Sequence, residues 1–253
     1  RAAVGAAPVE GDTLDLFSQE QESDTERTLE IITDKAKAKE LAAHLEDLVT
    51  KDGFEFYVLA DGSSQQEYMP VGVAFGTTDG KTSYVPIDND VLLAQGLTLG
   101  TFKEIFGRVL EHKKPIKCGY DTKYMKHVFA NVGINLAGVS DDVMLESYVL
   151  EAHRSHTIEK LAANWLKYEL RGEEELLGKG AKKLSFSQVS VEKAAEFASE
   201  RVFIVSRLNR LFKKALSDDA KLEKIYRDIE MPLSDVLFKM EQNGVLIDTK
   251  LLD

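Results

Sequence analysis

The chain has 253 residues, 43% of them hydrophobic and 30% charged, and its 43 Asp and Glu against 32 Lys and Arg give a net charge of -11. A chain of this length can bury a large core, but its negative charge argues against an autonomous nucleic-acid binder held by phosphate contacts. No apolar run approaches the roughly 20 residues of a membrane helix, no signal peptide is visible, and the single Cys118, expected to be a buried small hydrophobe, excludes an internal disulfide framework.

The first 27 residues predict an acidic linker. Small residues dominate its start, and an acidic tract follows from Glu20 to Glu26 without sustained periodicity. Two interpretations of the apolar Leu14 to Phe17 stay open, a docking peptide and a loose segment that touches the domain surface.

The next segment predicts strands packed with helices. Apolar residues at a period of two mark strands, apolar residues at helical spacing mark helices, and Thr33-Asp34 is typical of a helix N-terminus. Asp79-Gly80 predicts the turn of a hairpin. The expected strands are 29–32, 54–59, 71–75 and 82–86, and the expected helices run to about Leu48 and over 99–110.

Residues 116–150 predict a strand, helix, strand, helix unit in the middle of an α/β sheet. A strand over 116–118 breaks at Gly119 into a helix that ends at Asn131 and Gly133, residues that tolerate positive φ at a C-cap. A strand over 136–139 then leads through Ser140-Asp141 into an apolar helix that begins near Asp142. With the preceding strands, this unit predicts a mixed α/β sheet flanked by helices.

The remaining chain predicts helices. They cover 157–166, with Trp165 as a core residue, 191–216 and 220–243, and a strand over 245–248 follows. Residues 178–183 look like a phosphate cradle. They lack the Gly-x-x-x-x-Gly-Lys-Ser/Thr pattern and no strand precedes them, which favours a flexible basic loop.

Two segments resemble bacterial DNA polymerase I of family A. Asp142-Val143-Met144-Leu145-Glu146-Ser147-Tyr148-Val149-Leu150, with the helix over 161–166 and the loop Gly178-Lys179-Gly180, resembles that family's 3'-5' exonuclease domain. Ile229-Glu230-Met231-Pro232-Leu233, with Met240 to Asp248, is similar to the start of its polymerase domain. The resemblance covers residues 29–253. It implies a ribonuclease H-like (DnaQ-like) exonuclease fold over 28–217, behind the linker 1–27, and a C-terminal helical extension over 218–253 that begins the polymerase domain.

The resemblance also implies where a nuclease site belongs. That family's domain cleaves DNA with two divalent metals held by four carboxylates. Its strand motif Asp-x-Glu matches Leu59 and Asp61 here, its Asn and the Asp four residues on match Asp121 and Met125, and its helix motif Tyr-x-x-x-Asp matches Phe197 and Arg201. Three of the four ligands are then lost, and a guanidinium would repel a metal. We expect no catalytic residue and no metal site; the degenerate positions are Leu59, Asp61, Met125, Phe197 and Arg201.

Two other functions stay open. One is a residual metal-dependent exonuclease with displaced ligands, drawn from Asp61, Asp121, Asp141, Asp142 and Glu200. The ordinary roles of these carboxylates are turns, helix caps and ion pairs. The other is a non-catalytic module that binds single-stranded DNA through Lys179, Lys182 and Lys183, with Tyr124 and Phe197 for stacking. Solvated loop and core are the ordinary roles of these residues.

The favoured interpretation is a catalytically inactive exonuclease-like domain that serves as a structural module of a DNA replication and repair polymerase. Contact with DNA is expected through the full-length polymerase, and an intramolecular contact with the polymerase domain through the helix over 220–243. No cofactor is expected for this fragment, and Mg²⁺ is expected in the parent polymerase domain. We further expect a monomer in the cytoplasm, without a membrane partner.

Overall fold

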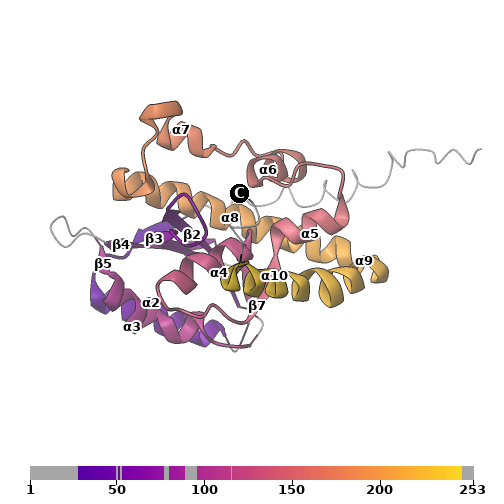
Figure 1. Cartoon of the computed structure of the whole chain (residues 1–253), viewed down its shortest axis with the longest axis horizontal. Coiled ribbons are helices and arrows are strands. Elements are labelled where there is room, and N and C mark those ends of the chain that lie inside the picture. Colours follow the sequence, from indigo (N-terminus) through magenta and orange to yellow (C-terminus); the bar gives the residue numbers. More distant parts are fainter. Residues whose placement is uncertain are drawn as a thin grey trace, which may run out of the picture.

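The fold is a seven-stranded mixed sheet with helices on both faces, seen in a computed structural model that describes residues 28–49, 51, 53–76, 80–88, 96–114 and 116–246 (Figure 1). The expected linker and the peptide Leu14 to Phe17 lie outside these residues. The strands are β1 (Thr28–Ile31), β2 (Phe54–Asp61), β3 (Met69–Gly76), β4 (Lys81–Asp88), β5 (Leu97–Thr98), β6 (Lys117–Gly119) and β7 (Val139–Asp142). The helices are α2 (Lys35–Leu48), α3 (Leu99–Leu110), α4 (Thr122–Asn131), α5 (Val143–Leu150), α6 (Ile158–Leu166), α7 (Glu173–Leu177), α8 (Val191–Ser217), α9 (Ala220–Ile225) and α10 (Met231–Asn243).

The strand order β1-β4-β3-β2-β6-β7 places β2 at the centre of the sheet, and β5 pairs with β4 off this path. β2 is antiparallel to β3 and parallel to β6, which is parallel to β7. The mixed sheet flanked by helices is confirmed, and so are the strands expected around β1 to β4 and β6. None of the helices among the described residues is long and apolar enough to cross a membrane.

The two faces of β2 bury different residues because side chains alternate along a strand. Its even-numbered residues, from Phe54 to Ala60, lie in a core with α2, α3 and α4. Leu59, from the opposite face, packs with residues of α8. Figure 1 shows α8 on one side of the sheet and α2 and α3 on the other.

Several elements differ from the sequence expectation. The second strand of the central unit was expected over 136–139 and is β7, Val139–Asp142, so its end consists of buried carboxylates. A π-helical turn, Tyr226–Glu230, separates α9 from α10 where one uninterrupted helix was expected. Residues 244–246 form no strand, and Ile247 and Asp248 lie outside the described residues. Trp165 is half-buried at the edge of a core, with its ring edge-on to Phe212, whereas Cys118 is buried as expected.

Candidate functional site

The end of β2 presents Tyr57, Leu59 and Asp61 on the face that α8 covers. The guanidinium carbon of Arg201, on α8, lies 6.0 Å from the centre of the Tyr57 ring. Leu59 packs with residues of α8 two positions further along the strand. This face of β2, together with α8, is where the resemblance places the nuclease site.

Asp61 faces a short 3₁₀ turn, Phe186–Gln188, that precedes α8. Its carboxylate accepts hydrogen bonds from the backbone N–H groups of Phe186 at 2.6 Å and Ser187 at 3.0 Å. Both bonds tie the loop before α8 to the end of the central strand. Asp61 therefore has a structural role here.

Asp61→Ala is expected to lower the free energy of unfolding by about 1–2 kcal/mol, because two backbone donors lose a charged acceptor. Urea unfolding followed by circular dichroism measures this change. Asp61→Asn retains one acceptor oxygen and should lose less. An unchanged midpoint in Asp61→Ala would refute the role in holding the loop.

Leu59 and Phe197 fill the space beside Asp61 with apolar packing. Leu59 is 1% exposed and Phe197 is 2% exposed. They share a core with Tyr84, Leu177 and Phe186, and the ring centres of Phe186 and Phe197 are 5.9 Å apart. Apolar side chains therefore fill the space around Leu59 and leave no room for a metal ion there.

Arg201 is buried and already paired. It is 1% exposed, and its guanidinium carbon lies 3.3 Å from the centre of the Phe197 ring. Its Nη2 donates to Oε1 of Glu159 on α6 and to the backbone oxygen of Arg171, both at 2.9 Å. The acid that neutralises Arg201 is therefore Glu159.

Met125 and Asp121 belong to α4. Met125 is 1% exposed and packs in the core on the far face of the sheet, with Phe56 and Val128. Asp121 caps α4 from a left-handed conformation with φ of 52°, one that Asp tolerates better than most residues. Burial raises the pKa of the Asp121 carboxyl, and nearby Asp142 raises it further. No carboxylate occupies the place of Met125.

Asp142 connects β7 to α4 and α5. Its oxygens accept bonds from the backbone N–H and hydroxyl of Thr122, at 2.7 and 2.8 Å, and from the N–H of Met144 at 2.9 Å. Burial raises the pKa of this carboxyl, and these donors oppose the rise. Asp142 is a cap, like Asp121.

The two remaining candidate carboxylates pair elsewhere. Asp141 contacts Lys213 Nζ at 2.7 Å and Arg227 Nη1 at 2.8 Å, and Glu200 accepts from the Tyr168 hydroxyl at 2.7 Å. In the part of the chain that the structure describes, no three His, Cys, Asp or Glu side chains are placed to hold a metal ion. Asp121 and Asp142 lie next to each other, but the five candidate ligands do not converge on one point.

The basic loop lies beside α7, a short acidic helix that the sequence pattern did not predict. Lys179 pairs with Glu174 at 2.6 Å and Lys183 with Glu173 at 3.8 Å, while Lys182 is exposed. Tyr124 stands edge-on to Tyr68 with ring centres 4.9 Å apart, and burial raises the pKa of its hydroxyl. Two of the three lysines offered for DNA contact are therefore already paired.

A cavity of about 570 Å³ opens beside Arg201 and Tyr57. Tyr57 was missed by the sequence analysis, although it lies two residues before Leu59 and so shares its face. Burial raises the pKa of Tyr57 to about 12, which keeps its hydroxyl protonated at neutral pH. Four acidic and two basic side chains line this cavity: Glu159, Glu173, Glu174, Glu175, Lys179 and Arg201. Its lining therefore offers a phosphate no surplus of positive charge.

Comparison with known proteins identifies the fold. Residues 70–208, more than half of the chain, match the family model described as DNA polymerase I, ribonuclease H-like domain. DNA polymerase I of Pseudomonas aeruginosa is 36% identical over 191 residues, which cover 74% of this chain and 21% of that protein. DNA polymerase I of Borreliella burgdorferi is 25% identical, over 95% of this chain and 26% of that protein. The chain thus spans about a quarter or less of the length of these relatives.

Solved structures show the same fold. The POL domain of Pol1 from M. smegmatis, in complex with DNA primer-template and dNTP, has a TM-score of 0.65 at 22% identity, covering 87% of this chain and 33% of that one. Brucella melitensis NrnC bound to pGG has a TM-score of 0.59 at 13% identity, covering 88% of this chain and 98% of that one. The ribonuclease H-like exonuclease fold, with a helical C-terminal part, is confirmed. The chain belongs to the DNA polymerase I family, in which it matches the ribonuclease H-like, exonuclease domain.

Proposed function

We propose that this domain is an inactive 3'-5' exonuclease domain, retained as a structural module of a longer DNA polymerase. The observation that carries the proposal is the buried Arg201, paired with Glu159 and stacked on Phe197, at the helix position where the family has a metal-binding Asp. The longer protein would supply polymerase activity, contact with DNA and the Mg²⁺ of its polymerase domain.

The geometry favours a different match for the family's strand motif. Arg201 lies next to Tyr57, and metal ligands on a strand and a helix must meet at one point. Tyr57 and Leu59 are also spaced as Asp-x-Glu, whereas Asp61 is bound to the backbone of Phe186 and Ser187. With this match, Tyr57, Leu59 and Arg201 replace three carboxylates on the α8 face of the sheet. Met125 replaces the fourth, and its side chain packs in the core of the opposite face.

These residues do not fit a pair of magnesium ions. Two such ions bring a charge of about +4 and require oxygen ligands close to the metal. Leu59 and Met125 offer no oxygen, Arg201 adds a positive charge, and the hydroxyl of Tyr57 stays protonated at neutral pH. The glutamates around the cavity sit on α6 and α7, with Glu159 bound to Arg201. No hydrolytic step is therefore assigned to this cleft.

A structural role is supported by polar contacts that hold the C-terminal helices on the domain. His127, on α4, contacts Oε2 of Glu241 at 2.7 Å and Nε2 of Gln242 at 3.0 Å, both on α10. Lys126 pairs with Asp235 of the same helix. The hydroxyl of Tyr226 accepts the backbone N–H of Asp142 at 2.9 Å. These contacts fix the direction in which α10 leaves the domain.

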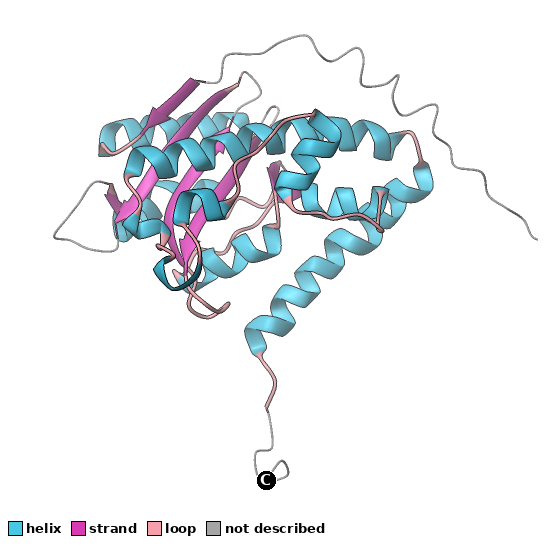
Figure 2. Ribbon diagram, turned by 90° about the horizontal axis from the view of Figure 1, so that it is seen from above, coloured by secondary structure: helices cyan, strands magenta, loops and turns pink. Residues whose placement is uncertain are grey.

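The opposite side of α10 is apolar and exposed. Four of its residues recur at helical spacing along one stripe, which Ile229 of the preceding π-helical turn extends: Leu233, Val236, Leu237 and Met240. Figure 2 shows this last helix projecting beyond the rest of the domain towards the C-terminus. An exposed apolar stripe of this kind is typical of an interface, and the polymerase domain that follows in the relatives would cover it.

The nuclease function is tested by incubating the purified chain with 5'-labelled single-stranded DNA and either Mg²⁺ or Mn²⁺. We expect no shortening of the labelled strand, because no carboxylate pair can hold the metals. A mock preparation purified in the same way without the chain controls for a contaminating nuclease. Metal-dependent shortening by the chain that the mock preparation lacks would overturn the proposal.

A further inference from the structure

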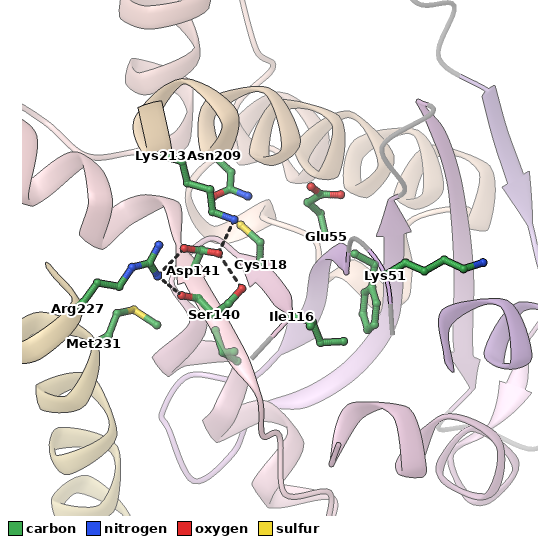
Figure 3. Close-up of a pocket in the computed structure, with 12 residues that line it drawn as sticks. Lys51, Glu55, Ile116, Cys118, Ser140, Asp141, Asn209, Lys213, Arg227 and Met231 are labelled. Carbon is green, nitrogen blue, oxygen red and sulfur yellow. Dashed lines mark hydrogen bonds and ion pairs between the residues drawn. The ribbon is translucent and has the colours of Figure 1, made fainter. Parts of the chain in front are cut away.

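A second cavity of about 570 Å³ lies away from the degenerate site, and its lining comes from six elements and two loops (Figure 3). It opens where β2 and β6 begin, between α8 and the π-helical turn. Its volume lies within the range of small-molecule sites, about 300–1,000 Å³. The residues that face it combine unused acceptors with a surplus of cations.

Two acceptors behind the wall of this cavity have no hydrogen-bond partner among the described residues. They are Oε2 of Glu55, on β2, and Oδ1 of Asn209, on α8. Both oxygens are buried, so a ligand in the cavity reaches them only when these two side chains turn towards it. Burial raises the pKa of Glu55, and a hydrogen bond with Ser206 opposes the rise. A buried polar atom without a partner costs free energy, and a ligand with N–H donors would remove that cost.

Two cations share one carboxylate on the same wall. Lys213, from α8, and Arg227, from the π-helical turn, reach Asp141 from opposite sides, as Figure 3 shows. Asp141 is 1% exposed, whereas the side chains of Lys213 and Arg227 are 45% and 38% exposed. The pair thus lies at the mouth of the cavity, where Asp141 contacts both cations and Glu146 lies near them. An ammonium and a guanidinium have further donors to offer.

We propose that this cavity binds a small organic phosphate that carries an amino group, the chemistry of a nucleotide with an exocyclic amine. The phosphate would lie at the mouth, on Lys213 and Arg227, because both are strong phosphate donors. The amino group would point inward to Asn209 and Glu55, since amide and carboxylate oxygens accept from the amino groups of adenine and cytosine. Phe54 and Ile116 add apolar surface to the lining of the cavity.

The same groups argue against simpler ligands. A metal ion would face Lys213 and Arg227, and the described residues hold no set of three ligands for one. Inorganic phosphate would satisfy the cations and leave Asn209 and Glu55 without donors. A ligand that carries both a phosphate and an amino group is therefore expected to bind more tightly than a ligand that carries only one of them.

Calorimetric titration of the chain with dAMP, deoxyadenosine and inorganic phosphate tests the proposal. We expect dAMP to bind at least about tenfold more tightly than either fragment, because each end adds charge-assisted or buried hydrogen bonds. dTMP, which lacks an exocyclic amine, should bind several-fold more weakly than dAMP. This comparison needs no variant and so does not depend on refolding.

Two substitutions on α8, with a third as a control, test whether dAMP binds in this cavity. Lys213→Met should weaken dAMP binding about tenfold, while Lys214→Met, the same change at the next residue, should leave it unaltered. Asn209→Leu should reduce the affinity for dAMP to that for phosphate. Equal affinities for phosphate and dAMP, equal losses in the two lysine variants, or no binding of dAMP would each overturn the proposal.

Discussion

Glu146→Gln is expected to leave the stability of the domain nearly unchanged at pH 4 and to raise it increasingly above pH 5. Glu146, on α5, is 0% exposed, and neither of its carboxylate oxygens has a partner among the described residues. Burial raises the pKa of Glu146 well above the ordinary value of 4.5, and nearby Asp141 adds to the rise. Lys213 and Arg227 oppose the shift without cancelling it.

The sign of the pH dependence follows from this shift. The folded state holds the proton of Glu146 more tightly than the unfolded state, so its contribution to stability is complete below the unfolded-state pKa. It is lost as the pH rises towards the folded-state pKa, by about 1.4 kcal/mol for each pH unit. Glutamine keeps the shape and cannot ionise, so the variant escapes this loss.

Urea unfolding of the two proteins at intervals from pH 4 to pH 8 measures the difference. Glu169→Gln, an exposed neutralisation on the same domain, is the matched control and should follow the unmodified protein. The prediction would be wrong if the free energy of unfolding of the unmodified protein and of Glu146→Gln changed in parallel with pH. The ionised Glu146 would then be stabilised by a hydrogen-bond or ion-pair partner.

The elements whose apolar pattern follows one period could be predicted from the sequence. β2 to β4 alternate or are apolar throughout. The stripe of α8 that was expected to face the core is buried at each position: Ala195, Ala198, Val202, Val205, Leu208 and Phe212. β7 was misplaced because its end, Ser140-Asp141-Asp142, looks like loop chemistry. Those carboxylates are accommodated in a buried strand end by Lys213, Arg227 and the backbone of α4, contacts between segments far apart in the chain.

The elements that form the candidate site could be predicted from the sequence, but the residues of β2 that match the family's strand motif could not. The motif on α8 singled out Phe197 and Arg201, and in the structure both side chains lie against β2. The partner of Arg201 could not be predicted, because Asp61 and Glu159 are equally good acids in the sequence. The structure brings Glu159 within 2.9 Å and commits Asp61 to the loop before α8. The spacing in the sequence did not decide between two matches for the strand motif, Leu59 with Asp61 and Tyr57 with Leu59, which differ by two residues.

Restoring carboxylates at all four positions, with Tyr57→Asp, Leu59→Glu, Met125→Asp and Arg201→Asp, is expected to unfold the domain. Leu59, Met125 and Arg201 are each 1% exposed, in packed surroundings. An unpaired buried carboxylate costs several kcal/mol, and removal of Arg201 also strips Glu159 of its partner. Three or four such changes exceed the roughly 5–15 kcal/mol that stabilise a typical domain.

Far-UV circular dichroism and calorimetric titration with Mn²⁺ measure the outcome. A matched variant with Lys160→Glu, Lys193→Glu and Lys182→Gln makes the same change in net charge at exposed positions and should remain folded. Comparing the two variants shows whether the loss of stability comes from burying the new carboxylates or from the change in net charge. A metal pair could stabilise the restored protein only by binding the folded form, and closure of the site by Leu59 and Phe197 opposes this. A restored variant that folds and binds two Mn²⁺ ions would mean that the cleft remains open to metals.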